Sequence, residues 1–148
     1  METFDCELIR SAFPAQPINT LSSLAFIIAA AYLWRRRHRL FGTVIGLTGV
    51  GSILFHGNPS SLSSALHDGA LVAAILGSGV LALRRIRLGA VPIASILVGA
   101  IGIVVWSTTR TGGSWCDPDA LIQGHAVWHV MAAFAVGALA AKPTHESS

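Results

Sequence analysis

Charged residues are scarce in this sequence. Asp, Glu, Lys and Arg together make up 11% of its 148 residues, whereas a typical soluble domain carries about 25%. Hydrophobic residues account for 53%, and the mean hydropathy is +0.64. A chain with so few charges cannot cover the surface of a water-soluble domain of this size, which indicates an integral membrane protein. Its length suits a single domain.

Several other features are absent, and each absence narrows the class of protein. The apolar stretches do not alternate with polar residues, which excludes the strands of a membrane β-barrel. No internal repeat with a period of about 20 to 50 residues is present, which excludes a solenoid. No basic segment precedes the first apolar stretch, where Asp5 and Glu7 stand instead. This is not the pattern of a signal peptide, so we expect the first apolar stretch to be retained.

Five apolar stretches predict an all-α fold. A helix that crosses a bilayer needs about 20 residues, with a usable range of about 17 to 25. We therefore expect a polytopic transmembrane helix bundle of about five spans in one domain. The expected spans lie near residues 19–34, 40–56, 64–83, 90–106 and 122–141, with segment 1–17 before them and a tail at 142–148 after them.

The basic residues predict the orientation of these helices. The net charge of +3 and the isoelectric point near 9.5 would suit a nucleic-acid-binding protein. The basic residues cluster directly after apolar stretches, however, which is a signal of membrane topology, and we expect no nucleic-acid partner. The positive-inside rule places the side that is richer in Lys and Arg in the cytoplasm, and the N-terminus outside. The small size favours a bacterial inner membrane. Eight of the ten Lys and Arg residues fall on that cytoplasmic side: Arg35, Arg36, Arg37, Arg39, Arg84, Arg85, Arg87 and Lys142.

The two cysteines both fall on the outer side. Cys6 precedes the first expected span, and Cys116 lies just before the fifth. An oxidising periplasmic or extracellular compartment permits a disulfide between them. Two free thiols near the membrane surface are the alternative. A disulfide would tie the N-terminal segment to the loop between the fourth and fifth spans.

Five polar side chains from three expected helices reach one depth near the outer surface. Ser52 and His56 are four residues apart near the outer end of the second span, so they share a helix face. Asp68 lies at the outer end of the third span. His125 and His129 are four residues apart at the outer end of the fifth. Polar groups at this depth are costly and usually functional.

Three histidines with a nearby carboxylate suit zinc. A catalytic zinc site uses three protein ligands and leaves one position open, and two His residues four apart on a helix can bind one metal ion. The sequence therefore predicts a Zn²⁺ site at His56, His125 and His129. Each part of this set also has a plainer interpretation. His56 alone could be a hydrogen-bonded residue at the membrane interface, and the spacing of His125 and His129 could arise by chance. His67 points about 100° away from Asp68 on a helix, so we leave it out of the site.

These residues resemble signature motifs of the alkaline ceramidases. Those enzymes belong to a wider superfamily of membrane hydrolases that includes the adiponectin and progestin receptors and the Per1-like proteins. The resemblance implies that the three histidines bind zinc, that Ser52 and Asp68 flank the zinc-bound water, and that Cys6 and Cys116 form a disulfide. The matching segments cover about half of the chain: FDCELIRSAFPAQPINTLSS (4–23), GSILFH (51–56), Asp68 and CDPDALIQGHAVWH (116–129).

The resemblance is incomplete in two respects. The family has seven spans and this chain about five, so walls of the substrate cavity are either absent or supplied by another subunit of a homo-oligomer. The family also has an N-terminal Ca²⁺ site. Asp5 and Glu7 would remain of it, but Gln16 and Ile9 stand where a carboxylate and a polar ligand are expected. Because Ca²⁺ takes about six to eight oxygen ligands, these replacements argue against calcium.

The leading hypothesis is a zinc-dependent hydrolase that cleaves an amide or ester bond of a membrane lipid. Asp68 would act as general base, and Ser52 would donate a hydrogen bond to the developing oxyanion. The alternative is a zinc-stabilised membrane module without catalytic activity, receptor-like or part of an assembly. An open fourth coordination position would favour the enzyme, and a fourth protein ligand the module. An ion pathway is disfavoured because the cytoplasmic halves of the spans carry almost no polar residues.

Overall fold

The computed structural model describes residues 5–87 and 92–141 of the chain. Within these ranges the backbone forms helices and connecting loops, with no strand. The predicted all-α fold is therefore confirmed for this part of the chain. The helices are α1 (Pro17–Ser22), α2 (Leu24–Arg35), α3 (Arg39–Gly57), α4 (Ser61–Arg87), α5 (Ile93–Thr109) and α6 (Gly124–Ala140).

Each expected apolar stretch corresponds to helix. The first is divided into α1 and α2 by a break at Ser23. Three helical segments are long and apolar enough to cross a membrane, namely Pro17–Arg35, Arg39–Gly57 and Ser61–Arg87, while α5 and α6 are apolar with 17 residues each. These lengths support a membrane-embedded helical bundle, and the orientation stays a prediction. Residues 90–91 of the fourth expected span and the tail at 142–148, with Lys142, lie outside the described residues.

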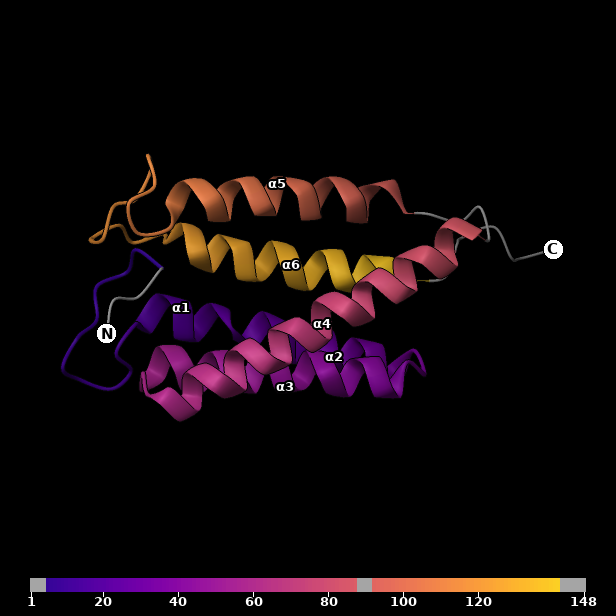
Figure 1. Ribbon diagram of the computed structural model, residues 1–148, viewed down its shortest axis with the longest axis horizontal. Helices are drawn as coiled ribbons and strands as arrows, with labels where there is room; N and C mark the ends of the chain where they lie inside the picture. The colour runs from indigo at the N-terminus through magenta and orange to yellow at the C-terminus, as the bar shows by residue number, and fades with distance from the viewer. Residues whose placement is uncertain (1–4, 88–91, 142–148) are drawn as a thin grey trace.

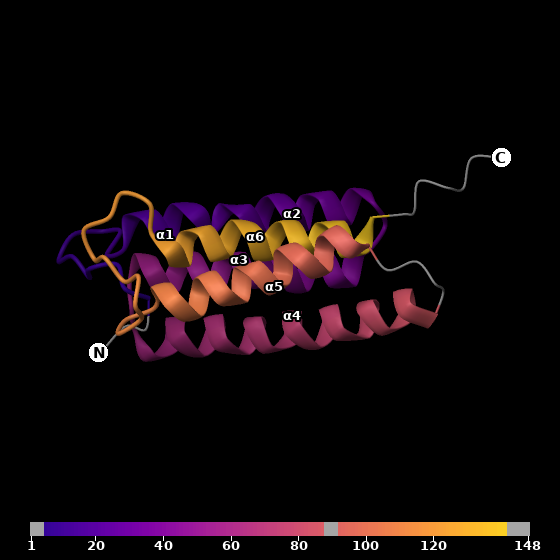
Figure 2. The ribbon, with the colours of Figure 1, turned by 90° about the horizontal axis from the view of Figure 1, so that it is seen from above.

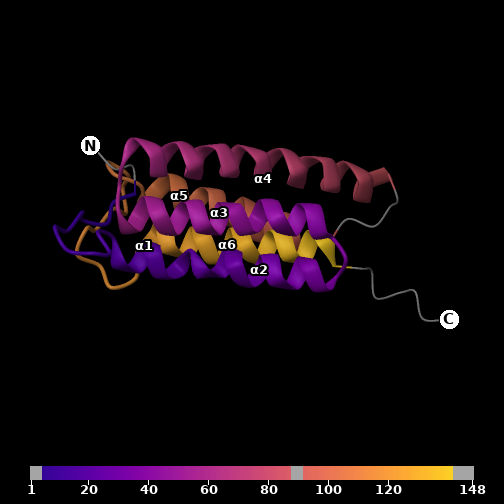
Figure 3. The ribbon, with the colours of Figure 1, turned by 90° about the horizontal axis from the view of Figure 1, so that it is seen from below.

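The helices run back and forth along one long axis (Figure 1). Seen from above and below, α2, α3 and α6 lie together, α5 packs against α6, and α4 packs against α3 at the periphery (Figures 2 and 3). The N-terminal segment, α1, the α3–α4 turn and the α5–α6 loop gather at one end, at the left of Figure 1. We call this the N-terminal end of the bundle. It is where the polar residues of interest lie.

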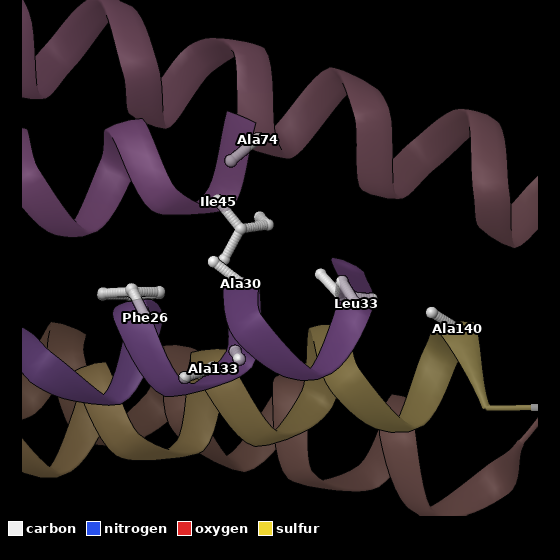
Figure 4. Close-up of a cluster of buried hydrophobic side chains, with 8 residues drawn as sticks. Phe26, Ala30, Leu33, Ile45, Ala74, Ala133 and Ala140 are labelled. Atoms are coloured by element: carbon white, nitrogen blue, oxygen red, sulfur yellow. The ribbon is translucent and has the colours of Figure 1, made fainter. Parts of the chain in front are cut away.

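Small side chains dominate the core between α2, α3 and α6. Figure 4 shows Ile45 of α3 pointing toward Ala30 of α2. Small residues let membrane helices approach closely, and the approach of α3 to α2 is tight at Gly49, where a Cβ atom would lie 2.7 Å from Ile27 Cδ1. The buried cluster comprises Phe26, Ala29, Ala30, Leu33, Ile45, Ala74, Ala133 and Ala140.

A distant carboxylate caps the start of α1. Pro17 occupies the first turn, where its fixed φ suits a helix and its missing N–H is no loss. The next two N–H groups donate to Glu7: Ile18 N to Oε1 and Asn19 N to Oε2, both at 2.9 Å. Free N–H groups and the helix dipole both favour an anion at this position. Glu7 thereby fastens the N-terminal segment to the bundle.

The N-terminal segment is also fastened covalently. Cys6 and Cys116 form a disulfide with their Cα atoms 5.6 Å apart, which confirms the predicted pairing. The Cys6 N–H donates to Thr111 Oγ1 at 3.0 Å, and the Gln16 N–H donates to the His56 carbonyl oxygen at 2.9 Å. The segment therefore connects the α5–α6 loop to the end of α3.

Candidate metal centre

Three histidines meet at the N-terminal end of the bundle. His56 lies in the last turn of α3, and His125 and His129 lie in the first turns of α6. The ring centroids are 5.1 Å apart for His56 and His125, 5.2 Å for His56 and His129, and 4.5 Å for His125 and His129. One nitrogen of each lies within 4.8 Å of the others, and all three side chains are buried. The predicted histidine triad is therefore assembled, and it can hold a metal ion.

The protonation state of His56 follows from its partner. His56 Nδ1 lies 2.7 Å from Gln16 Oε1. The other end of the Gln16 amide, Nε2, donates to the Glu7 carbonyl oxygen at 2.7 Å, which fixes the orientation of the amide. An amide oxygen only accepts, so His56 Nδ1 carries the proton. His56 Nε2 is left with a lone pair, buried and without a protein partner among the described residues.

The same reasoning applies to His129. Its Nδ1 lies 2.8 Å from Ser22 Oγ. Ser22 already donates its single proton to the Asn19 carbonyl oxygen at 3.0 Å. Ser22 therefore accepts from His129, which puts the proton on Nδ1 and the lone pair on Nε2.

His125 faces a carboxylate that the sequence analysis did not assign to the site. Asp5 Oδ1 lies 3.2 Å from His125 Nδ1, and Asp5 Oδ2 lies 3.7 Å from His56 Nδ1. The closer contact is within ion-pair distance but outside hydrogen-bond alignment. A carboxylate at Nδ1 favours the proton there, as at the other two histidines. All three rings thus face a protein oxygen with Nδ1, and Nε2 of His56 and His125 has no protein partner among the described residues.

Unsatisfied polar atoms concentrate at this site. The described residues contain six buried side-chain nitrogen or oxygen atoms without a hydrogen bond, and four of them belong to Asp5, His56 and His125. Each such atom costs about 1–3 kcal/mol when it lacks a partner. A cation bound by the Nε2 atoms would satisfy the nitrogen lone pairs. Imidazole nitrogens are typical ligands of zinc, so the donor set fits the predicted Zn²⁺.

Ser52 lies inside the site. It is fully buried, with Oγ 3.4 Å from His129 Nε2 and 2.9 Å from Ser23 Oγ. Ser23 gives its proton to the Asn19 carbonyl oxygen at 2.7 Å, so it accepts from Ser52. The Ser52 hydroxyl is therefore held by a chain of hydrogen bonds and turns a lone pair toward the centre.

Asp68 lies apart from the triad. Its side chain is 68% exposed, and its Oδ1 lies 2.9 Å from His67 Nδ1. The expectation that His67 points away from the site is wrong, because its ring stacks on Phe55 at 5.0 Å and lies 6.1 Å from that of His56. The reason is the packing of α4 on α3. The α4 backbone at His67 meets Gly51, where a Cβ atom would lie 3.0 Å from His67 Cα, and this turns His67 inward and Asp68 outward.

The residues that hold the histidines were missed from the sequence. Gln16, Ser22 and Ser23 each bond a site residue. They lie at or just before the start of the first expected span, at the same end of the bundle as the three histidines, so their shared depth was a signal in the sequence.

Asp5 gave no such signal, because it lies in irregular chain before the first helix. Its position depends on contacts remote in sequence, among them the disulfide at the next residue. Burial, together with the smaller effects of the charges of Asp68 and Glu7, raises the pKa of Asp5 to about 6. The charge of Asp68 therefore acts on Asp5, although Asp68 does not contact the triad.

The residues implied for a calcium site have other partners. Both carboxylate oxygens of Glu7 accept backbone N–H groups of α1. Gln16 bridges the Glu7 carbonyl oxygen and His56, Asp5 faces two histidines, and Ile9 is half exposed. In the described part of the chain, the histidine triad is the group of His, Cys, Asp or Glu side chains that is suited to a metal ion.

Comparison with known protein families, characterised proteins and solved structures finds no match to this chain.

Proposed function

We propose that this protein is a zinc-dependent membrane hydrolase that cleaves an amide or ester bond of a lipid. The observation that carries the proposal is the common orientation of the three imidazoles. Each has Nδ1 beside a protein oxygen, and one ring nitrogen of each lies within 4.8 Å of the others. This is how histidines are prepared to bind a metal ion.

The number of ligands favours a catalytic site over a structural one. Three histidines form the group, and no fourth His, Cys, Asp or Glu joins them in the part of the chain that the structure describes. Structural zinc sites use four protein ligands, whereas catalytic sites use three and keep one position open. Zinc in such a position polarises a carbonyl group and lowers the pKa of water from 15.7 to about 7.

Ser52 and Asp68 are the proposed catalytic side chains. Ser52 Oγ adjoins His129 Nε2, and a rotation about one single bond redirects its proton from Ser23 to a substrate oxygen that gains negative charge. Asp68 is the proposed proton acceptor. Its side chain is exposed and contacts His67.

An apolar groove beside the centre supports a lipid substrate. The groove lies between α2 and α6 and has a volume of about 440 Å³. Two of its lining residues follow residues of the site along the chain, since Ala25 lies one turn after Ser22 and Val130 comes directly after His129. Apart from the Tyr32 hydroxyl, no lining side chain carries a polar group, so an alkyl chain fits this lining better than a polar ligand does. The other lining residues are Ile28, Ala29, Tyr32, Ala133, Phe134, Gly137 and Ala138.

A second candidate is a zinc-stabilised module without activity, and burial of the triad favours it. His56 is 0% exposed, His129 2% and His125 6%. A substrate would have to enter past the N-terminal segment or from the groove. A purely structural metal needs no such route.

Turnover separates the two candidates. The purified protein is incubated with a panel of lipid amides and esters, first as isolated, then after removal of zinc by a chelator, and then after zinc is returned. The hydrolase proposal expects cleavage that disappears and returns with the metal. Zinc-bound protein that cleaves nothing across the panel would favour the structural module.

A further inference from the structure

Asp5 is the buried acid of the metal centre. The residue is 5% exposed, its Oδ1 lies 3.2 Å from His125 Nδ1, and its Oδ2 lies 3.7 Å from His56 Nδ1. We propose that Asp5 is a positioning residue that orients His125 for metal binding and offsets the charge of the bound cation. This inference rests on the proposed metal centre, but not on any catalytic activity there.

The side of the ring that Asp5 occupies determines its role. Asp5 lies at the Nδ1 edges of His125 and His56, whereas the Nε2 atoms of these two rings have no protein partner among the described residues. A carboxylate behind a histidine fixes the orientation of the ring and makes its other nitrogen a better ligand. From that side it acts through His125 rather than on the metal. Gln16 and Ser22 occupy the corresponding positions behind His56 and His129.

Charge gives Asp5 a function that Gln16 and Ser22 cannot supply. Three neutral imidazoles and a divalent cation would bury two positive charges, and an unpaired buried charge is costly. Asp5 is the buried carboxylate that contacts the triad, whereas Asp68 is exposed and contacts His67. Asp5 therefore halves the buried charge and orients one ligand.

The N-terminal segment delivers Asp5 to this position. The neighbouring Cys6 is bonded covalently to Cys116 and donates its N–H to Thr111. On the far side, the Glu7 N–H donates to the Asp5 carbonyl oxygen at 2.8 Å, and the Glu7 carboxylate caps α1. The aspartate is thus held by a crosslink and a helix cap within two residues.

The test is the zinc affinity of four variants and the wild type, measured in detergent by competition with a chromophoric chelator. Asp5→Ala should bind zinc about 10- to 100-fold more weakly, which is the usual effect of removing a partner of a metal-binding histidine. Asp5→Asn should fall in between, because an amide oxygen can still face His125 Nδ1 but carries no charge. Asp119→Asn, an exposed acid in the α5–α6 loop, should equal the wild type. His125→Ala should lose zinc.

Two further measurements distinguish positioning from general support of the fold. Thermal unfolding of the metal-free proteins should differ little between Asp5→Asn and the wild type. Cobalt(II) bound in place of zinc should show altered visible absorption in Asp5→Asn, because the ligand His125 is no longer polarised by a charge.

The possible results separate this inference from the proposed function. Wild-type affinity in Asp5→Ala would overturn the inference. Loss of zinc in Asp5→Asn as complete as in His125→Ala would also overturn it, because Asp5 would then be a ligand. Absence of zinc from the wild type would remove both proposals. Weakened binding in Asp5→Ala, in a protein that hydrolyses no lipid, would support the inference and count against the hydrolase.

Discussion

The amide of Gln16 allows a sharp test of how the centre is organised. Gln16 is fully buried, and its two ends have separate tasks: Oε1 accepts from His56 Nδ1, and Nε2 donates to the Glu7 carbonyl oxygen. Gln16→Leu removes both hydrogen bonds. Gln16→Glu keeps an acceptor for His56 and removes the donor to Glu7.

The magnitudes follow from the atoms left without partners. Gln16→Leu leaves one buried donor and one buried acceptor unsatisfied, at about 1–3 kcal/mol each, so the free energy of unfolding should fall by about 2–6 kcal/mol. Zinc affinity should fall about 10- to 100-fold, because His56 loses the partner that keeps the proton on Nδ1. Gln16→Glu should lose stability at the Glu7 carbonyl but retain zinc affinity.

A second buried glutamine provides the control. Gln123 is 2% exposed and donates to the carbonyl oxygens of Asp117, Pro118 and Ala120. Gln123→Leu should therefore lower stability with little change in zinc affinity. Chemical denaturation and chelator competition on the three variants give both quantities. If Gln16→Glu weakens zinc binding as much as Gln16→Leu does, the assignment of the His56 proton is wrong.

Three other predictions test the crosslink, the catalytic side chains and the groove. Cys6→Ser should lower the free energy of unfolding by about 2–5 kcal/mol under oxidising conditions, measured by denaturation, and equal stability would show that the disulfide does not hold the N-terminal segment. Asp68→Asn should keep its zinc and lose about 10²- to 10⁴-fold in turnover. Ser52→Ala should lose about 10²- to 10³-fold in turnover. Loss of zinc from Asp68→Asn would contradict the role of Asp68 as general base. Gly137→Leu places a side chain in the groove and should shift the preferred substrate to shorter acyl chains. The control Gly79→Leu, on the open surface of α4, should leave the preference unchanged. An unchanged chain-length profile in Gly137→Leu would exclude the groove as the acyl site.

The helices and the histidine triad could be predicted from the sequence for physical reasons. A continuous apolar stretch of sufficient length has no stable alternative to helix in a membrane. The spacing of His125 and His129 places them on one helix face, and the alternation of spans brings His56 to the same end. The same alternation places both cysteines on one side, which permits the disulfide that the structure contains but does not by itself exclude two free thiols.

Rotation of one helix against another was not predictable in the same way. The helical angle between His67 and Asp68 was known, but not which of the two faces α3. Close packing of α4 at Gly51 decides this and turns His67 inward. The position of Asp5 depends on a disulfide, a helix cap and loop hydrogen bonds acting together, and none of these is a periodic pattern in the sequence.

The zinc content of the purified protein is the sharpest test of a metal centre at the histidine triad. Protein purified without chelator is analysed for metal per chain, beside His125→Ala and His38→Ala. His38 precedes α3 at the opposite end of the bundle, so its loss should leave the centre intact. We expect about one zinc per chain in the wild type and in His38→Ala, and none in His125→Ala. Wild-type protein without zinc, or His125→Ala with its zinc retained, would contradict it.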